Sequence, residues 1–218
     1  MALITVAQYI HIYAQIIHSK DMPTDKVRVT YIFKLILERL VMNIRQFVTG
    51  NDKQGNAIFM ANNDVIPVEG DLLPGFKTFE LWSTKNGSVV PHKGELNQVD
   101  NYFPEVNGSV FRVITFPAQV NGQSPFNFSE EAVAEMQTKL PGLIEHLEPE
   151  NPGMHTTNSI DYGIVISGEI YLELDNGEER LLTTGNCVVQ NGTRHAWVNK
   201  SNKPATMAFI LLGVNRES

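Results

Sequence analysis

Cysteine is almost absent from this chain: the 218 residues include one, Cys187. A single cysteine can form neither an intramolecular disulfide nor a thiolate cage for zinc. This usage fits a reducing compartment, and we expect a cytoplasmic protein. Cys187 is followed by two valines in the stretch GNCVVQNG. We therefore predict a buried packing cysteine rather than a reactive thiol.

Other absences narrow the function further. No apolar run approaches the roughly 20 residues that a membrane span needs, and the first residues lack the basic start of a secretory signal. The net charge is −7 and no cluster of Lys and Arg occurs, so nucleic acid is an unsuitable partner. We also find no βαβ pattern and no phosphate-binding glycine loop. These observations argue against a membrane-spanning protein, a nucleic-acid-binding protein and a fold with a phosphate-binding loop.

Glycine is missing from the first 41 residues, which carry five basic and three acidic side chains, whereas the remainder is strongly acidic. Ile32, Leu35, Ile36 and Leu40 follow helical spacing there. We predict that residues 1–42 are a helical N-terminal extension and that residues 43–218 form a single domain. The extension is either a helical arm that packs on the domain or on a partner, or a stretch upstream of a natural start at Met42. We favour the second explanation.

The sequence pattern changes after residue 42. Short apolar runs broken by Gly and Asn follow, and this pattern is typical of β-strands joined by tight turns. A hairpin is predicted in residues 43–63, and strands in GFKTFELWST and SVFRVITFPA. One helix is predicted to begin after Ser129, because Ser caps helices and two glutamates follow it. Six closely spaced strands are predicted in the last 65 residues. The fold class is therefore mainly β, an antiparallel barrel or jelly roll with one or two short helices.

Two histidines and one aspartate stand out in the C-terminal part. In an extended segment, His155, Thr157 and Asp161 share one face, because side chains alternate along a strand. His195 lies on a later strand that an antiparallel barrel can bring beside the first. Two imidazoles and a carboxylate suit a divalent metal. The alternative is that the histidines are hydrogen-bonded core residues and that Asp161 caps a turn.

The segment around His155 resembles the first sequence motif of the cupin superfamily. That motif runs from glycine through His-x-His to glutamate and, six residues later, a closing glycine. His155 takes the position of the first histidine, Asp161 that of the acid and Gly168 that of the closing glycine. Thr157 stands where the second histidine is usual, and aspartate is one methylene shorter than glutamate. A four-ligand site thus becomes a three-ligand site at most.

The second cupin motif is also matched. Gly185, Gly192, His195 and Asn199 take its glycine, glycine, histidine and asparagine positions, while Gln190 replaces its proline. The chain also resembles a small single-domain cupin subgroup with a His…Ser-Ile-Asp-Tyr…Gly-Thr-x-His-x-Trp pattern. The resemblance covers residues 43–214 and is most specific in the last 65 residues.

The resemblance implies a metal-dependent enzyme acting on a small oxygenated organic molecule, with dioxygenase, decarboxylase, dehydratase or isomerase chemistry. His155, Asp161 and His195 would hold a divalent ion (Fe, Zn, Mn or Ni), and Thr157 and Tyr162 are the candidate catalytic residues. We expect a homodimer with a small-molecule substrate and neither membrane nor nucleic acid as a partner. The alternative is a metal-free binding or sensing protein on a degenerate cupin barrel, and a second alternative is a structural or regulatory dimer.

Overall fold

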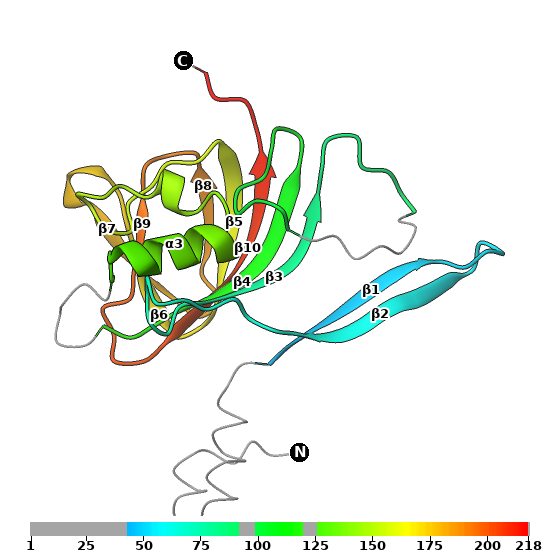
Figure 1. Ribbon diagram of the computed structural model, residues 1–218, viewed down its shortest axis with the longest axis horizontal. Coiled ribbons are helices and arrows are strands. Elements are labelled where there is room, and N and C mark those ends of the chain that lie inside the picture. The colour runs from blue at the N-terminus through cyan, green and yellow to red at the C-terminus, as the bar shows by residue number, and fades with distance from the viewer. Residues whose placement is uncertain (1–42, 92–98, 120–125, 218) are drawn as a thin grey trace, which may run out of the picture. The chain divides into compact units, whose positions relative to one another are not determined.

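The computed structural model in Figure 1 describes residues 43–91, 99–119 and 126–217. Residues 44–218 form one compact unit. The predicted N-terminal extension lies outside the described residues.

The described part consists of ten strands and three short helical segments. The strands are β1 (Ile44–Asn51), β2 (Ala57–Val65), β3 (Lys77–Thr84), β4 (Ser109–Phe116), β5 (Ser159–Ser167), β6 (Glu169–Glu173), β7 (Glu179–Thr183), β8 (Cys187–Asn191), β9 (Ala196–Val198) and β10 (Ala205–Gly213). The helical segments are the α-helix α3 (Glu130–Lys139) and the 3₁₀ turns η1 (Ile144–His146) and η2 (Asp175–Gly177). The mainly β class, the first hairpin and the six C-terminal strands are confirmed.

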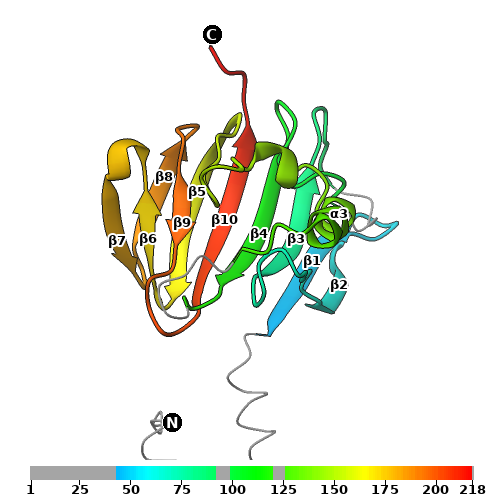
Figure 2. The ribbon, with the colours of Figure 1, turned by 60° about the vertical axis from the view of Figure 1, so that its left-hand side comes forward.

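Within the described residues all the strand pairs are antiparallel and fall into three sheets. The five-stranded sheet has the order β3-β4-β10-β5-β8, the three-stranded sheet has the order β7-β6-β9, and β1 pairs with β2 alone. Figure 2 shows β10 between β4 and β5, so the last strand of the chain joins the earlier strands to the motif-bearing ones.

The prediction of a closed barrel is not met, because no strand pairing within the described residues joins the five-stranded sheet to the three-stranded one. The chain leaves the first sheet for the second at Gly168, which has a φ of 77°. A Cβ there would lie 2.7 Å from Pro204 O and 2.9 Å from the Cα of Ala205. Only glycine accommodates both this backbone conformation and the close approach. The turn therefore ends one sheet and starts the next.

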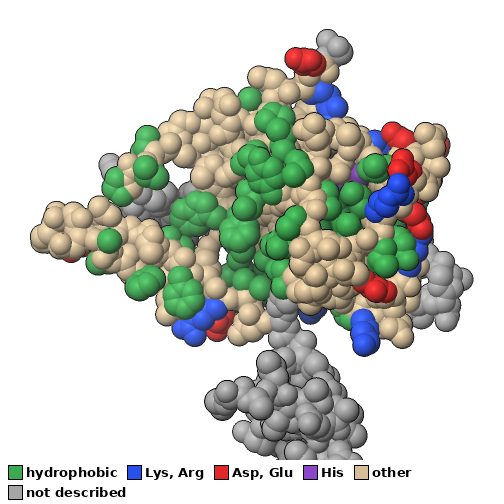
Figure 3. Space-filling view, turned by 180° about the vertical axis from the view of Figure 1, so that it is seen from behind, with side chains coloured by type: hydrophobic (Ala, Val, Ile, Leu, Met, Phe, Trp, Pro, Cys, Tyr) green, Lys and Arg blue, Asp and Glu red, His purple; other side chains and the backbone are tan. Residues whose placement is uncertain are grey.

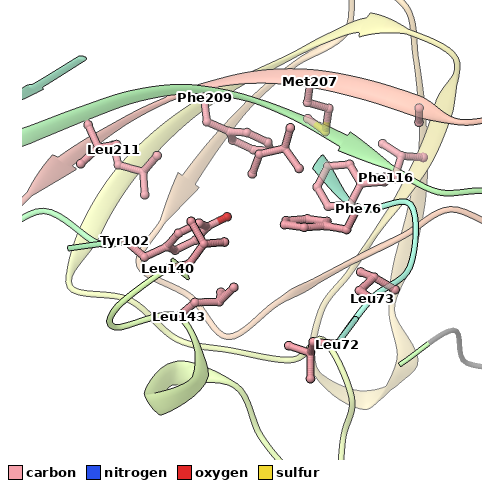
Figure 4. Close-up of a cluster of buried hydrophobic side chains, with 14 of the residues drawn as sticks. Leu72, Leu73, Phe76, Tyr102, Phe116, Leu140, Leu143, Met207, Phe209 and Leu211 are labelled. Carbon is pink, nitrogen blue, oxygen red and sulfur yellow. The ribbon is translucent and has the colours of Figure 1, made fainter. Parts of the chain in front are cut away.

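Both sheets nevertheless contribute side chains to one hydrophobic core, and Figure 4 shows part of it. Val165 and Met207 come from the five-stranded sheet, and Ile170 from the three-stranded sheet. The Trp197 ring meets the Phe209 ring edge-on at 5.4 Å between centroids. Edge-to-face aromatic pairs of this kind add about 0.5–1.5 kcal/mol to the burial of their area.

Helix α3 begins as predicted, because the Ser129 side chain accepts a hydrogen bond from the backbone N–H of Ala132. It ends at Lys139, before Pro141. Its buried residues are Ala132 and Met136, and Met136 belongs to the core cluster. None of the helices in the described part of the chain is long and apolar enough to cross a membrane.

The prediction that Cys187 is a buried packing residue is wrong, because its side chain is exposed. It starts β8 at the edge of the five-stranded sheet. The apolar neighbours of Cys187 did not indicate which face of β8 is buried. Val189, two residues on, is exposed on the same side as Cys187, whereas Gln190 is buried.

Candidate functional site

A cavity of about 350 Å³ opens inside the core, and this volume lies within the range of small-molecule sites. Its wall is largely apolar and includes Leu72, Phe76, Ile114, Phe116, Phe209 and Leu211. Five charged or imidazole side chains also line it: Arg112, His155, Asp161, Glu173 and His195. A mainly apolar pocket with a few convergent polar groups is the usual form of a site for an organic ligand.

His155 and His195 lie opposite each other on adjacent backbone segments. The N–H of each donates to the C=O of the other at 3.0 Å, which makes them a hydrogen-bonded antiparallel pair. Both side chains therefore project from the same face, and their ring centroids are 4.2 Å apart. The structure thus brings together the two histidines that the sequence singled out.

Backbone carbonyls fix the orientation of both imidazoles. Nδ1 of His155 lies 3.0 Å from Gly153 O, and Nδ1 of His195 lies 2.9 Å from Thr193 O. A carbonyl can only accept, so each Nδ1 carries the proton and each Nε2 is left with a lone pair. This is the arrangement in which proteins present histidine to a metal ion.

Burial keeps both rings neutral. It lowers the pKa of the His155 imidazole below its usual value, and it lowers the pKa of His195 to about 3, with a further contribution from the neighbouring His155. Neutral imidazole is the form that ligates a metal or accepts a proton.

The loop before His195 is tied to the loop before His155 by an ion pair. Arg194 donates from Nε and Nη2 to the two carboxylate oxygens of Glu148, both at 2.6 Å. The N–H of Glu148 in turn donates to Met154 O. Paired hydrogen bonds between a guanidinium and a carboxylate are geometrically specific, so this contact helps to keep the two histidine-bearing segments in register.

Asp161 on β5 enters the same cavity and is almost completely buried. Desolvation raises the pKa of its carboxyl to about 6, although the Ser159 hydroxyl and Arg112 oppose the shift. Ser159 Oγ lies 2.6 Å from Asp161 Oδ1 and 2.9 Å from Thr157 Oγ1. Because an ionised carboxylate only accepts, Ser159 donates its one hydroxyl proton in a hydrogen bond to Asp161, and Thr157 Oγ1 lies within hydrogen-bond distance on the other side of Ser159. The hydrogen bond from Ser159 therefore orients the Asp161 carboxylate.

The two candidate catalytic residues occupy different places. Thr157 is buried and reaches Asp161 through Ser159, but it is not part of the cavity wall. Tyr162 follows Asp161 on β5 and so points to the opposite face, where 47% of it is exposed. Tyr162 thus points away from the cavity, and Thr157 lies behind Ser159 and Asp161 rather than in the wall.

Sequence reasoning missed Arg112, a buried charge in the cavity wall. It lies on β4, directly opposite Glu80 on β3, and its guanidinium carbon lies 3.6 Å from the centre of the Tyr102 ring. The sequence contained an indication of this position. Arg112 is an even number of residues from the apolar Val110, Ile114 and Phe116, so it points to the same face of the strand as they do. A charged residue on the core-facing side of a strand is an exception that calls for a partner.

The fit of this site to a metal ion is partial. Two adjacent neutral imidazoles with unprotonated Nε2 atoms suit a divalent cation. Among the residues that the structure describes, however, no three His, Cys, Asp or Glu side chains are gathered closely enough to hold one ion together. Asp161 therefore shares the cavity with the histidines without forming a three-residue cluster with them.

Comparison with known proteins finds a family model that matches the C-terminal part of the chain. Residues 143–211 match the family model described as a cupin domain, and this segment contains His155, Asp161 and His195. The match supports placement in the cupin superfamily. The finer subgroup pattern remains a prediction.

Curated relatives come from fungi. The chain is 28% identical over 186 residues to the cupin-domain-containing oxidoreductase fogC of Aspergillus ruber, covering 82% of this chain and 75% of the relative. It is 38% identical over 109 residues to phomopsin biosynthesis cluster protein C' of Diaporthe leptostromiformis (47% of this chain, 58% of the relative). It is 52% identical over 60 residues to phomopsin biosynthesis cluster protein D of the same fungus (27% and 32%). The chain thus spans less than two thirds of the latter two relatives. Of these three relatives, fogC is described as an oxidoreductase.

Proposed function

We propose that this protein is a divalent-metal-dependent oxidoreductase of the cupin type that acts on a small oxygenated organic molecule. The observation that carries the proposal is the His155–His195 pair, whose Nε2 lone pairs belong to side chains lining one apolar cavity. Several fungal relatives are described as cupin-domain-containing oxidoreductases, which supports oxidation over decarboxylation, dehydration and isomerisation. Among the chemistries expected from the sequence, this favours the dioxygenase class.

His155 and His195 would hold the metal ion. Asp161 shares their cavity without clustering with them, so it would become the third ligand only as the bound ion draws its carboxylate toward the pair. Such an ion would supply Lewis acidity toward a substrate oxygen, and iron would add redox chemistry. The protein contributes the neutral state of both rings and the orientation that Gly153 and Thr193 impose on them.

Asp161 has a second use in this proposal. With a pKa of about 6, its carboxyl is mostly ionised at neutral pH, yet it can hold a proton at modest cost. Ser159 binds Oδ1, and no described residue donates a hydrogen bond to Oδ2. Oδ2 is therefore the atom at which Asp161 would ligate the ion or accept a substrate proton. The apolar wall limits water around it.

A second candidate is a metal-free small-molecule binding or sensing protein. The absence of a three-residue ligand cluster within the described ranges favours it, as does Thr157 in place of a further histidine. Under this alternative the imidazoles serve as hydrogen-bond acceptors for a ligand.

Elemental analysis of untagged protein separates the two candidates. The proposal predicts close to one divalent ion per chain after purification without added metal, or saturable uptake of one equivalent of Fe²⁺, Mn²⁺, Zn²⁺ or Ni²⁺ by chelator-treated protein. Substoichiometric metal together with no saturable uptake would leave the metal-free binder as the function.

A further inference from the structure

Arg112 is one of the most completely buried side chains of the protein, with 1% of its surface exposed. It lies in the wall of the cavity that also contains His155, Asp161 and His195. Arg112 is not a ligand of the proposed metal site. It is also not needed to orient Asp161, which Ser159 already holds. Its burial therefore needs a separate explanation, because guanidinium groups are rarely removed from water without partners.

The partners of Arg112 account for only part of its hydrogen-bonding capacity. Nη2 donates to the backbone carbonyl of Tyr102 and lies 3.1 Å from Glu80 Oε2. Nε and Nη1 are buried and have no hydrogen-bond partner among the described residues. A guanidinium has five N–H donors, and buried donors left without acceptors are costly.

The charge of Arg112, by contrast, is already balanced. Glu80 is its cross-strand neighbour and lies within ion-pair distance. Asp161 and Glu173 bring two further carboxyls to the cavity wall. An anionic ligand would add another negative charge to this cavity, which costs desolvation without a matching cation. What the free donors lack is therefore an acceptor atom, not a negative charge.

We propose that the cavity binds an apolar molecule through a neutral carbonyl oxygen, which accepts hydrogen bonds from Arg112. The inference rests on the proposed function, because it takes this cavity as the substrate site and specifies what the substrate presents there. The face of the guanidinium is stacked on the Tyr102 ring, so its N–H donors lie at the edge of that stack. The apolar wall receives the remainder of the ligand.

Three probes of nearly equal shape test the acceptor: 2-acetylnaphthalene (a ketone), 2-naphthoate (a carboxylate) and 2-ethylnaphthalene (a hydrocarbon). Binding to the full chain is followed by the fluorescence of Trp197, which lies in the cavity wall, with Trp82 (the second tryptophan of the chain) replaced by Phe. We expect the ketone to bind at least about tenfold more tightly than the hydrocarbon, and more tightly than the carboxylate, since hydrogen bonds to charged donors are strong.

Variants assign the preference to Arg112. R112M should reduce the advantage of the ketone over the hydrocarbon to about twofold or less. R180M is the control, because Arg180 is exposed, and it should leave the advantage unchanged. Because R112M leaves Glu80 unpaired and could unfold the chain, the double variant R112M/E80Q is measured as well, with a thermal melt for each protein. The wild-type comparison of ketone and hydrocarbon requires no variant.

Each titration is run on protein as purified and after chelator treatment. A ketone preference that survives chelation and is lost with Arg112 supports the inference, whatever the metal analysis finds. A preference that disappears on chelation and survives in R112M would assign the carbonyl to the metal and overturn the inference while leaving the proposed function intact. Equal binding of ketone and hydrocarbon, tightest binding of naphthoate, or no binding of the ketone up to its solubility would also overturn it.

Discussion

His155 and His195 exchange backbone hydrogen bonds in both directions and hold their imidazole centres 4.2 Å apart. Each ring is also fixed through Nδ1 by a carbonyl two residues before it in the chain. The two side chains thus have little freedom to separate, and their Nε2 atoms are presented together. A site prepared in this way binds a ligand with little loss of conformational entropy.

Asp161 and Thr157 should respond differently to substitution. D161N keeps the shape of the side chain but removes its charge, and we expect metal affinity to fall at least about tenfold, since even the loss of an outer partner of a metal ligand costs roughly 10–100-fold. T157V should change affinity by less than about threefold, because Thr157 reaches Asp161 only through Ser159. Calorimetric titration of chelator-treated protein measures both. Equal losses in the two variants would contradict the assignment of Asp161 as a ligand.

Gly163 on β5 makes room for Phe209, which lines the cavity, and for Met207 of the hydrophobic core. A Cβ there would lie 3.1 Å from Phe209 Cε1 and 3.3 Å from Met207 Cε. G163A should therefore lower the free energy of unfolding by about 1–3 kcal/mol, because an overpacked core must shift. Denaturant unfolding tests this. Combined with F209L, the same change should cost less than the sum of the two single variants, and simple additivity would show that the Phe209 contact is not the cause.

The outer face of the five-stranded sheet exposes a row of apolar side chains without a charge among them (Figure 3). Phe111, Ile210, Tyr162 and Val189 are consecutive cross-strand neighbours. Soluble monomers rarely expose large apolar patches. We propose that a second copy of the chain covers this face, since an uncharged surface can meet itself in a two-fold dimer without repulsion.

Light scattering coupled to size exclusion tests the dimer. The wild type should have twice the chain mass of 24.4 kDa, and I210E should shift it toward the monomer. I66E is the matched control, because Ile66 is an exposed isoleucine outside the three sheets. A monomeric wild type, or an I210E variant that remains dimeric, would contradict the proposal.

Much of the local structure follows from the sequence. Alternation of apolar residues predicted the strands, glycine and asparagine marked the turns, and Ser129 marked the start of α3. Parity along the strands also placed His155 and Asp161 on one face, and both line the cavity. Strands, turns, the helix start and side-chain alternation depend on residues that are close in the chain, and they can therefore be predicted from the sequence.

The parts that escaped prediction depend on long-range pairing. Glu80 and Arg112 face each other because β3 and β4 are paired in one particular register, with a bulge after Glu80, and the sequence does not display that register. Whether the sheets close depends on pairing between distant edges. Tyr162 was assigned to the site from its place in a motif, although its parity with Asp161 already directed it to the outer face.

The most direct test of the central claim compares metal content in H155A, H195A and H146A. His146 is a suitable control, because its ring packs against Phe103 and its Nδ1 bonds Gly142 O, outside the cavity wall. After reconstitution and removal of excess ion, the account predicts close to one ion per chain in the wild type and in H146A, and loss of most of it in H155A and in H195A. Full occupancy in both H155A and H195A, with melts showing folded protein, would contradict it.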